Sequence, residues 1–178
     1  MKQATRKTQT VPALDIVVVW RILKYEADMF ITLRKRRLAG SAETYLQFAL
    51  IEAELIHVRV LCGFLLDLKT HPTDVSLADM ITGKRAAPLV DSIKKLCDEY
   101  GRKTDQTRLH WQINKFVAHF TRERKTAAQY GQLLADVEPK LATVLENVAG
   151  DSQCPWPNGS AVLLPMFAKD TGSTNAFP

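Results

Sequence analysis

The stretch 42–68 is apolar on nearly every side when it is wound as a helix, and this constrains the fold more than any other feature. Its apolar residues leave no continuous polar stripe: Tyr45, Phe48, Leu50, Ile51, Leu55, Ile56, Val58, Val60, Leu61, Phe64 and Leu65. A helix that is apolar all round is normally buried by other elements. We therefore expect 42–68 to be the central helix of the domain.

Amphipathic helical patterns with capping signals account for most of the remaining chain. A helix over 13–38 ends at Gly40, and Ser41 is a suitable N-cap for the next one. Further helices are predicted over 88–100, between Pro88 and Gly101; over 105–120, capped by Thr104; and over 126–148, with a Thr126/Gln129 capping box and a kink at Pro139. One helical turn is expected before Met80. The fold class is all-α, an antiparallel bundle of four to five helices with a short irregular C-terminal tail.

A length of 178 residues fits one domain. We expect a flexible N-terminus over 1–10, the helical bundle over 11–149 and an irregular tail over 150–178, where Pro, Gly, Ser and Asn are frequent. No stretch has the roughly 20 apolar residues that a membrane span needs, and no signal peptide is recognisable. Three cysteines without metal-ligand spacing favour free thiols and a cytoplasmic protein.

The net charge of +5 is concentrated in two blocks. Residues 1–38 hold nine Lys and Arg against three acids, and residues 101–125 hold seven against two. Such asymmetry favours a polyanionic partner such as RNA. The alternative for the run Arg34-Lys35-Arg36-Arg37 is that it is solvated and complements the dipole of a helix end.

The helix predicted over 105–120 carries the candidate chemistry. Arg108, Gln112, Lys115 and His119 are spaced to share one face of an α-helix, so a basic row would end in an imidazole. Such a row suits phosphate binding or RNA cleavage. Trp111 and Phe116 are aromatic residues that stack on bases in some proteins, although single aromatics on an amphipathic helix are more often part of a core.

The central helix also contains four ionisable residues, Glu52, Glu54, His57 and Arg59. Because burying an unpaired charge is costly, we expect them to form a buried polar network. The alternatives are a polar site in which His57 and Arg59 face His119, or a metal site formed by Glu54, His57 and His119. If the network is buried, Arg59→Met should cost on the order of 3 kcal/mol of stability.

Two short motifs resemble the HEPN superfamily, the helical-bundle domains of many toxin–antitoxin and phage-defence ribonucleases. Asn114, Lys115, His119 and Thr121 resemble the Asn-Lys-x-x-x-His-x-Thr segment of an HEPN-like group of small bacterial proteins, and His57, Arg59 and Phe64 resemble the His-x-Arg-x-x-x-x-Phe segment of the same group. The resemblance implies metal-independent attack by an RNA 2′-hydroxyl. Its site would comprise His119, Asn114 and Arg108, with phosphate contacts from Lys115, Arg122 and Arg124, in a homodimer without cofactor or metal.

The chain departs from that family at one position that matters. The motif arginine should stand at 112, 113 or 114, where this chain has Gln112, Ile113 and Asn114. Arg108, Arg122, Arg124 or Arg59 must then supply the guanidinium, or the site binds phosphate without cleaving it.

We therefore expect an RNA-binding or nucleotide-binding HEPN-like protein, which would be a ribonuclease if it is an enzyme. The alternative is a non-catalytic helical interaction module, antitoxin-like or a scaffold subunit. In that case the tail would bind a protein partner through the apolar residues Trp156, Leu163, Leu164, Met166 and Phe167.

Overall fold

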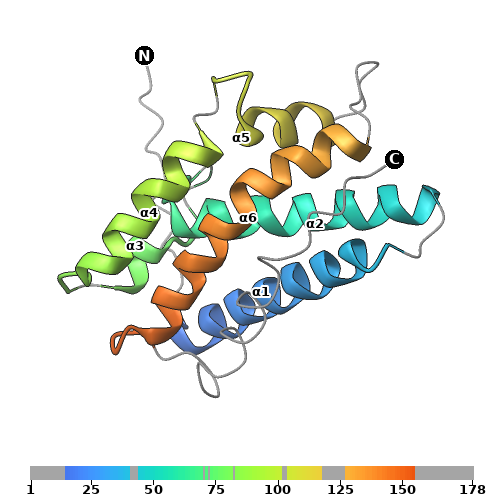
Figure 1. Ribbon diagram of the computed structural model, residues 1–178. Helices are drawn as coiled ribbons and strands as arrows, with labels where there is room; N and C mark the ends of the chain where they lie inside the picture. Colours follow the sequence, from blue (N-terminus) through green and yellow to red (C-terminus); the bar gives the residue numbers. More distant parts are fainter. Residues whose placement is uncertain are drawn as a thin grey trace, which may run out of the picture.

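The computed structural model describes residues 15–40, 44–69, 71, 73–81, 83–101, 104–117 and 127–154. Among these residues every regular element is helical (Figure 1). The elements are α1 (Ile16–Leu38), α2 (Thr44–Leu65), α3 (Leu77–Met80), α4 (Ala87–Tyr100), α5 (Leu109–Gln112), the π-helix η1 (Ile113–Val117) and α6 (Ala127–Gly150). The predicted all-α class is confirmed.

Local side-chain chemistry sets the ends of the long helices. Asp15 caps α1, because its Oδ1 accepts hydrogen bonds from the backbone N–H groups of Val17 and Val18 at 3.1 and 3.2 Å. Gly40, just beyond α1, has a positive φ of 69°, which glycine adopts without strain. α2 stops at Leu65 rather than near residue 68, because Asp67 takes a left-handed φ of 57° and reverses the chain.

The helices pack as two antiparallel pairs. In α1 and α2, Arg37 contacts Glu54 while the earlier Glu26 contacts the later His57, so the two helices run in opposite directions. In α4 and α6, Asn147 lies by Pro88, and Lys140 lies 2.9 Å from Glu99 near the other end of α4. α6 also packs on α2 and thereby joins the two pairs (Figure 1).

The core lies between these pairs. Its largest fully buried side chains come from all the long helices: Trp20, Phe30, Leu55, Leu61, Leu65, Leu89, Leu96, Tyr100 and Leu134. The turn after α6 also packs against the core, because Cys154 is buried and the Gln153 side-chain amide donates to the Lys84 carbonyl at 3.1 Å. The chain therefore stays on the bundle four residues beyond α6, further than the predicted start of the tail.

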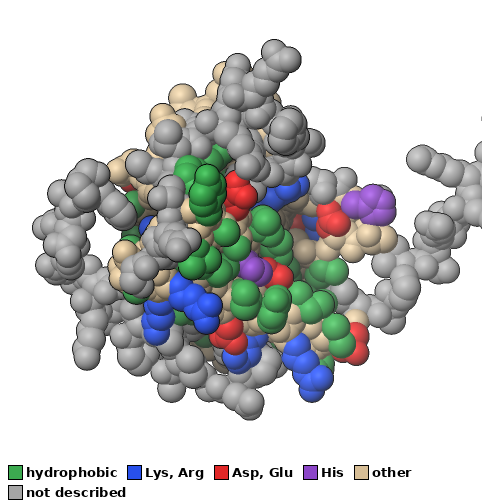
Figure 2. Space-filling view, turned by 90° about the vertical axis from the view of Figure 1, so that its right-hand side faces the viewer, with side chains coloured by type: hydrophobic (Ala, Val, Ile, Leu, Met, Phe, Trp, Pro, Cys, Tyr) green, Lys and Arg blue, Asp and Glu red, His purple; other side chains and the backbone are tan. Residues whose placement is uncertain are grey.

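α2 is less enclosed than its sequence indicates. Leu55, Val58 and Leu61 are fully buried, as expected of a central helix. Ile56 and Val60, however, remain 51% and 43% exposed, so the expectation that α2 is covered on every side is wrong for the described residues. Figure 2 shows apolar side chains gathered on one face of the molecule, around a partly covered histidine beside an acidic side chain.

The region predicted as one helix over 105–120 is built differently. Asp105 accepts hydrogen bonds from the N–H and hydroxyl of Thr107 at 3.0 and 2.7 Å, which holds 105–107 in a turn. α5 therefore begins only at Leu109, and Arg108 rather than Thr104 is its N-cap residue. The helix then widens into η1, and residues 118–126 lie outside the described part of the chain.

Within the described ranges, none of the helices combines the length and the apolar character that crossing a membrane requires.

Candidate functional site

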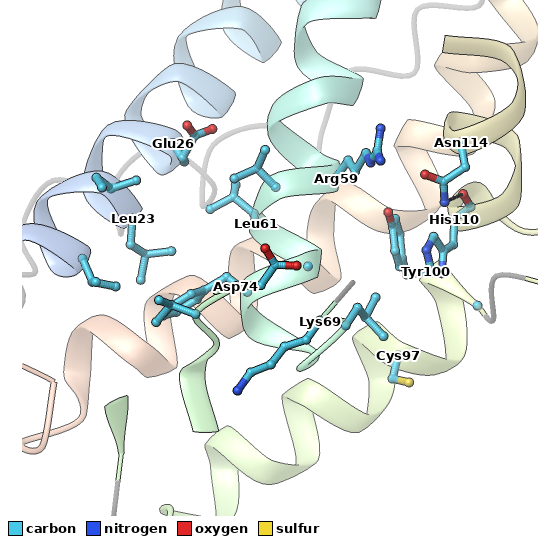
Figure 3. Close-up of a pocket in the computed structure, with 18 residues that line it drawn as sticks. Leu23, Glu26, Arg59, Leu61, Lys69, Asp74, Cys97, Tyr100, His110 and Asn114 are labelled. Atoms are coloured by element: carbon cyan, nitrogen blue, oxygen red, sulfur yellow. Dashed lines mark hydrogen bonds between the residues drawn. The ribbon is translucent and has the colours of Figure 1, made fainter. Parts of the chain in front are cut away.

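A cleft of about 940 Å³ opens between α1, α2 and the C-terminal end of α4, and α5 and η1 close one edge. Its two walls differ in character (Figure 3). α1 contributes apolar side chains such as Leu23, whereas α4, α5 and η1 contribute Tyr100, His110 and Asn114. Arg59 projects from α2 toward this second group. The cleft thus combines an apolar wall with a polar wall.

Arg59 is the positive charge of the polar wall. It is exposed, and the described residues supply no ion-pair partner for it. The charge of Arg59 also acts on the neighbouring Tyr100. Burial raises the pKa of the Tyr100 phenol, and the nearby Cys62 thiol adds to this rise, whereas the positive charge of Arg59 opposes it. Tyr100 stays protonated at neutral pH, and Figure 3 shows its hydroxyl directed toward Arg59. The wall therefore offers a guanidinium and a neutral hydroxyl as hydrogen-bond donors.

The π-helix positions Asn114 beside these donors. The side-chain Nδ2 of Asn114 donates to the His110 carbonyl at 2.9 Å, and the His110 ring stacks on Tyr100 with centroids 4.9 Å apart. This leaves the amide oxygen of Asn114 as an acceptor on the cleft side (Figure 3). Single π-turns of this kind are frequent at functional sites.

His57 does not join this polar wall. Its Nδ1 lies 2.6 Å from Oε2 of Glu26, a cleft-lining carboxylate on α1, and both side chains are largely covered. Glu54 is bonded to Arg37 on α1 instead, so Glu54 and His57 do not pair with each other. No group of three or more His, Cys, Asp and Glu side chains placed to hold a metal occurs in the described part of the chain.

The other residues of the predicted phosphate site are dispersed. Arg108 lies outside the cleft, with Nη1 at 3.3 Å from Oε1 of Glu99. Lys115 is exposed and its Nζ lies 5.1 Å from the centre of the Trp111 ring. Gln112 is buried and donates to the Gln106 carbonyl. The predicted row from Arg108 to Lys115 is therefore wrong, because α5 starts late and η1 changes the helical repeat.

His119, Arg122 and Arg124 lie outside the described residues. Of the site residues predicted around residues 108–124, only Asn114 is a described lining residue of the cleft. It shares the cleft with Arg59, which sequence reasoning assigned to the core. Sequence reasoning missed Tyr100 as a site residue, because its spacing on α4 marked only the apolar face of that helix.

A buried chain of ion pairs joins α1, α2 and α6. Nε of Arg37 donates to Oε2 of Glu54 at 2.7 Å, and Nη2 of Arg37 donates to Glu138. Nε of Arg34 donates to the other oxygen of Glu138, also at 2.7 Å. Arg37 and Glu54 are only 8% and 0% exposed. Two arginines and two carboxylates thus compensate one another inside the bundle.

This network differs from the predicted one in its members. Glu54 is buried as expected, but Arg59 is exposed and Glu52 is half-buried, so the expected burial of Arg59 is wrong. The reason is that α2 turns Arg59 toward the open cleft while Glu54 faces α1. The partners Arg37 and Glu138 come from other helices, which the pattern of α2 alone does not reveal.

The spacing of the basic residues at the end of α1 is a signal in the sequence for this ion-pair network. Arg34 and Arg37 are three residues apart and therefore share a face of α1. The alternative that the run 34–37 is solvated holds for Lys35 and Arg36, which are exposed, and is wrong for Arg34 and Arg37, which both bond Glu138. A basic run whose i and i+3 members lie on the apolar side of a helix indicates buried acids elsewhere.

The ion-pair network and its burial shift the pKa values of two of its members, Glu54 and Arg37. Burial raises the pKa of Glu54 to about 7; the hydrogen bond from Arg37 opposes this shift, and the Glu138 carboxylate adds to it. The pKa of Arg37 is also raised, because the two carboxylates outweigh the opposing effect of burial. Cys62 is fully buried and its thiol pKa is raised by burial, so it is unsuited to act as a nucleophile.

Comparisons of the chain with protein-family models, with curated proteins and with solved structures found no match in any of the three. The cleft is therefore the feature from which a function can be inferred.

Proposed function

We propose that the chain binds RNA or a nucleotide, with a phosphate group seated on the polar wall of the cleft. The observation that carries this proposal is Arg59: an exposed guanidinium without an ion-pair partner among the described residues, lining the same cleft as Tyr100 and Asn114. A planar guanidinium donates two parallel hydrogen bonds to phosphate oxygens, which gives both energy and orientation.

The other groups of the cleft suit the rest of a ribonucleotide. The Tyr100 hydroxyl is a neutral donor for a third phosphate oxygen, and the amide oxygen of Asn114 accepts a hydrogen bond from a ribose hydroxyl. The apolar wall around Leu23 and Phe64 offers a surface for a base. An acceptor for the 2′-hydroxyl would let the protein distinguish RNA from DNA.

The resemblance to HEPN proteins supports the same ligand class and a toxin–antitoxin or phage-defence setting. In this proposal Arg59 supplies the guanidinium that the motif position lacks. Cleavage is a separate claim. It requires His119 as general acid or base near the bound phosphate, together with attack by the 2′-hydroxyl, for which no metal is needed.

Binding is tested by fluorescence anisotropy with a labelled single-stranded RNA and a DNA of the same sequence. Arg59→Gln should weaken RNA binding by roughly tenfold or more, since a charge-assisted hydrogen bond contributes about 1.5–3 kcal/mol. Arg36→Gln, which removes an exposed arginine at the end of α1, is the matched control. Equal losses in both variants would show that binding depends on overall charge rather than on the cleft.

Asn114→Ala tests the ribose contact. We expect it to reduce the ratio of RNA affinity to DNA affinity while DNA binding changes little. An unchanged ratio would remove Asn114 from the proposed contact.

Cleavage is tested by incubating the labelled RNA in the presence of a chelator with the wild type and with His119→Ala. Cleavage should appear only in the wild type. Equal RNA decay in both proteins would remove the catalytic claim and leave the binding proposal intact.

A helical interaction module is the second candidate function, and the exposed apolar residues Ile56 and Val60 favour it. In that case Ile56→Glu should abolish a specific protein complex and leave RNA binding unchanged. The opposite pattern supports the cleft as the functional site.

A further inference from the structure

Exposed apolar side chains extend from the cleft onto the outside of α1 and α2. Val18, Ile22 and Tyr25 follow one another at i, i+4 and i+7 along α1, and Ile56 and Val60 lie on α2; all five are 43–56% exposed. We name these five residues the α1–α2 face. Ile22 and Val60 also line the cleft, so the face adjoins the cleft.

The five side chains are grouped rather than scattered, since they lie on two helices that pack together. Soluble monomers rarely leave a contiguous apolar patch of more than a few hundred Å² uncovered. α2 has the sequence of a helix enclosed on all sides, yet its main described neighbours are α1, α6 and η1. Something apolar should therefore cover its remaining side.

The same chain contains an apolar segment that the structure does not describe. Residues 161–167 read Ala-Val-Leu-Leu-Pro-Met-Phe, seven apolar residues without a charge. The six residues before them, 155–160, contain two prolines and a glycine and no charged residue. Packing this segment on the exposed face would lower the free energy by roughly 25 cal/mol per Å² of apolar area removed from water.

The point of attachment places the segment within reach. Cys154 and Gln153 hold the end of α6 on the bundle, at the end where α1 begins (Figure 1). Seven steps of chain from residue 154 to residue 161 span at most roughly 25 Å. That length exceeds two helix diameters of about 10 Å each, so the segment can pass one helix and arrive at the first turns of α1.

We propose that residues 161–167 pack on the α1–α2 face in the same chain. The short tether favours this occupant over a second copy, because it gives the segment an effective concentration in the millimolar range. The proposal does not depend on the phosphate site, since it concerns the outer α1–α2 face and not Arg59, Tyr100 or Asn114.

Disulfide trapping in the full-length chain tests the proposal. Leu164→Cys is combined with Ile22→Cys in one variant and with Val60→Cys in another, both with Cys97→Ser and Cys154→Ala; Cys62 is fully buried. The matched controls carry Phe177→Cys, an apolar tail position outside the segment, in place of Leu164→Cys. Two anchor positions make the result independent of the direction of one side chain.

After mild oxidation, peptide mapping should identify an intrachain disulfide to residue 164. It should form about tenfold or more faster than the disulfide to residue 177, at a rate that does not change with protein concentration. If the disulfides to residues 164 and 177 form at equal rates at both anchor positions, the segment has no preferred binding position on the face and the proposal fails. Disulfides that join two chains and increase with concentration would assign the face to a second copy instead. None of these outcomes bears on the RNA-binding test, because that test uses Arg59 and Asn114.

Discussion

Arg37 is a buried residue on which the stability of the bundle depends. Its guanidinium bonds Glu54 and Glu138, and the residue is only 8% exposed. Its removal therefore leaves two buried carboxylates with Arg34 as the one remaining arginine of the network. The cost of about 3 kcal/mol expected from the sequence for Arg59→Met belongs to Arg37 instead, because Arg59 is exposed.

Arg37→Met should lower the free energy of unfolding by roughly 3–5 kcal/mol, measured by urea denaturation at pH 8, where Glu54 is ionised. Arg37→Met combined with Glu54→Gln should cost less than the sum of the two single changes. Arg36→Met, one residue away and exposed, should change stability by no more than about 0.5 kcal/mol. Additive losses for Arg37 and Glu54 would contradict a coupled ion pair.

Glu54 gives the bundle a pH-dependent stability of defined sign. Its pKa is raised by burial from an ordinary 4.5 to about 7, so the folded protein holds this proton more tightly than the unfolded chain. The resulting stabilisation is fully present below pH 4.5 and is lost as the pH rises through about 7. The unfolding free energy of the wild type, minus that of Glu54→Gln, should therefore fall between pH 5 and pH 8. A difference that stays constant over this range would mean that Glu54 titrates normally.

At the scale of the elements, the ends of helices follow local chemistry closely. Gly40 and Gly101 act where the sequence places a stop, and Pro88 lies in the first turn of α4; the Asp15 cap starts α1 at Ile16, three residues later than predicted. α5 and η1 are the exception, because the turn made by Asp105 and Thr107 competes with the start of a helix. A periodic apolar pattern does not reveal that competition.

Asp67 provides a test of the αL position that ends α2. With φ at 57°, Asp67→Gly should raise the free energy of unfolding by about 0.5–1 kcal/mol, because glycine adopts this conformation without a Cβ clash. Asp67→Ala should lower it, since alanine lacks the local hydrogen bonds that help Asp to tolerate a positive φ. The order Gly, Asp, Ala from most to least stable is the prediction, and thermal or urea denaturation checks it. Alanine as stable as glycine would mean that the backbone relaxes at this position.

At the scale of the whole molecule, the net charge of +5 makes any binding to RNA dependent on salt. Each phosphate neutralised on a single strand contributes about 0.7 to the slope of log K against log salt concentration. We expect Arg59→Gln to reduce that slope by about this amount, and Arg36→Gln to leave it unchanged. The measurement is a series of anisotropy titrations between low and physiological salt. Identical slopes for wild type and Arg59→Gln would place the phosphate outside the cleft.

The sequence by itself determined the helical class and most of the long helices, because both depend on neighbours three or four residues apart. Apolar periodicity indicated α1, α4 and α6, and the apolar character of 42–68 indicated that α2 contributes heavily to the core. The buried charge of Glu54 was also predictable, since its neighbours Leu55 and Val58 are core residues.

Only the tertiary structure decided which groups meet. Arg34 and Glu138 are 104 residues apart, and their contact depends on how α1 and α6 are rotated and shifted against each other. In the same way, the rotation of α2 about its own axis decides which of its residues are buried. It buries Glu54, turns Arg59 into the cleft beside Tyr100 and Asn114, and leaves Ile56 and Val60 exposed. Helix rotation and offset are set by the packing of many side chains from distant parts of the chain, and no local pattern contains that information.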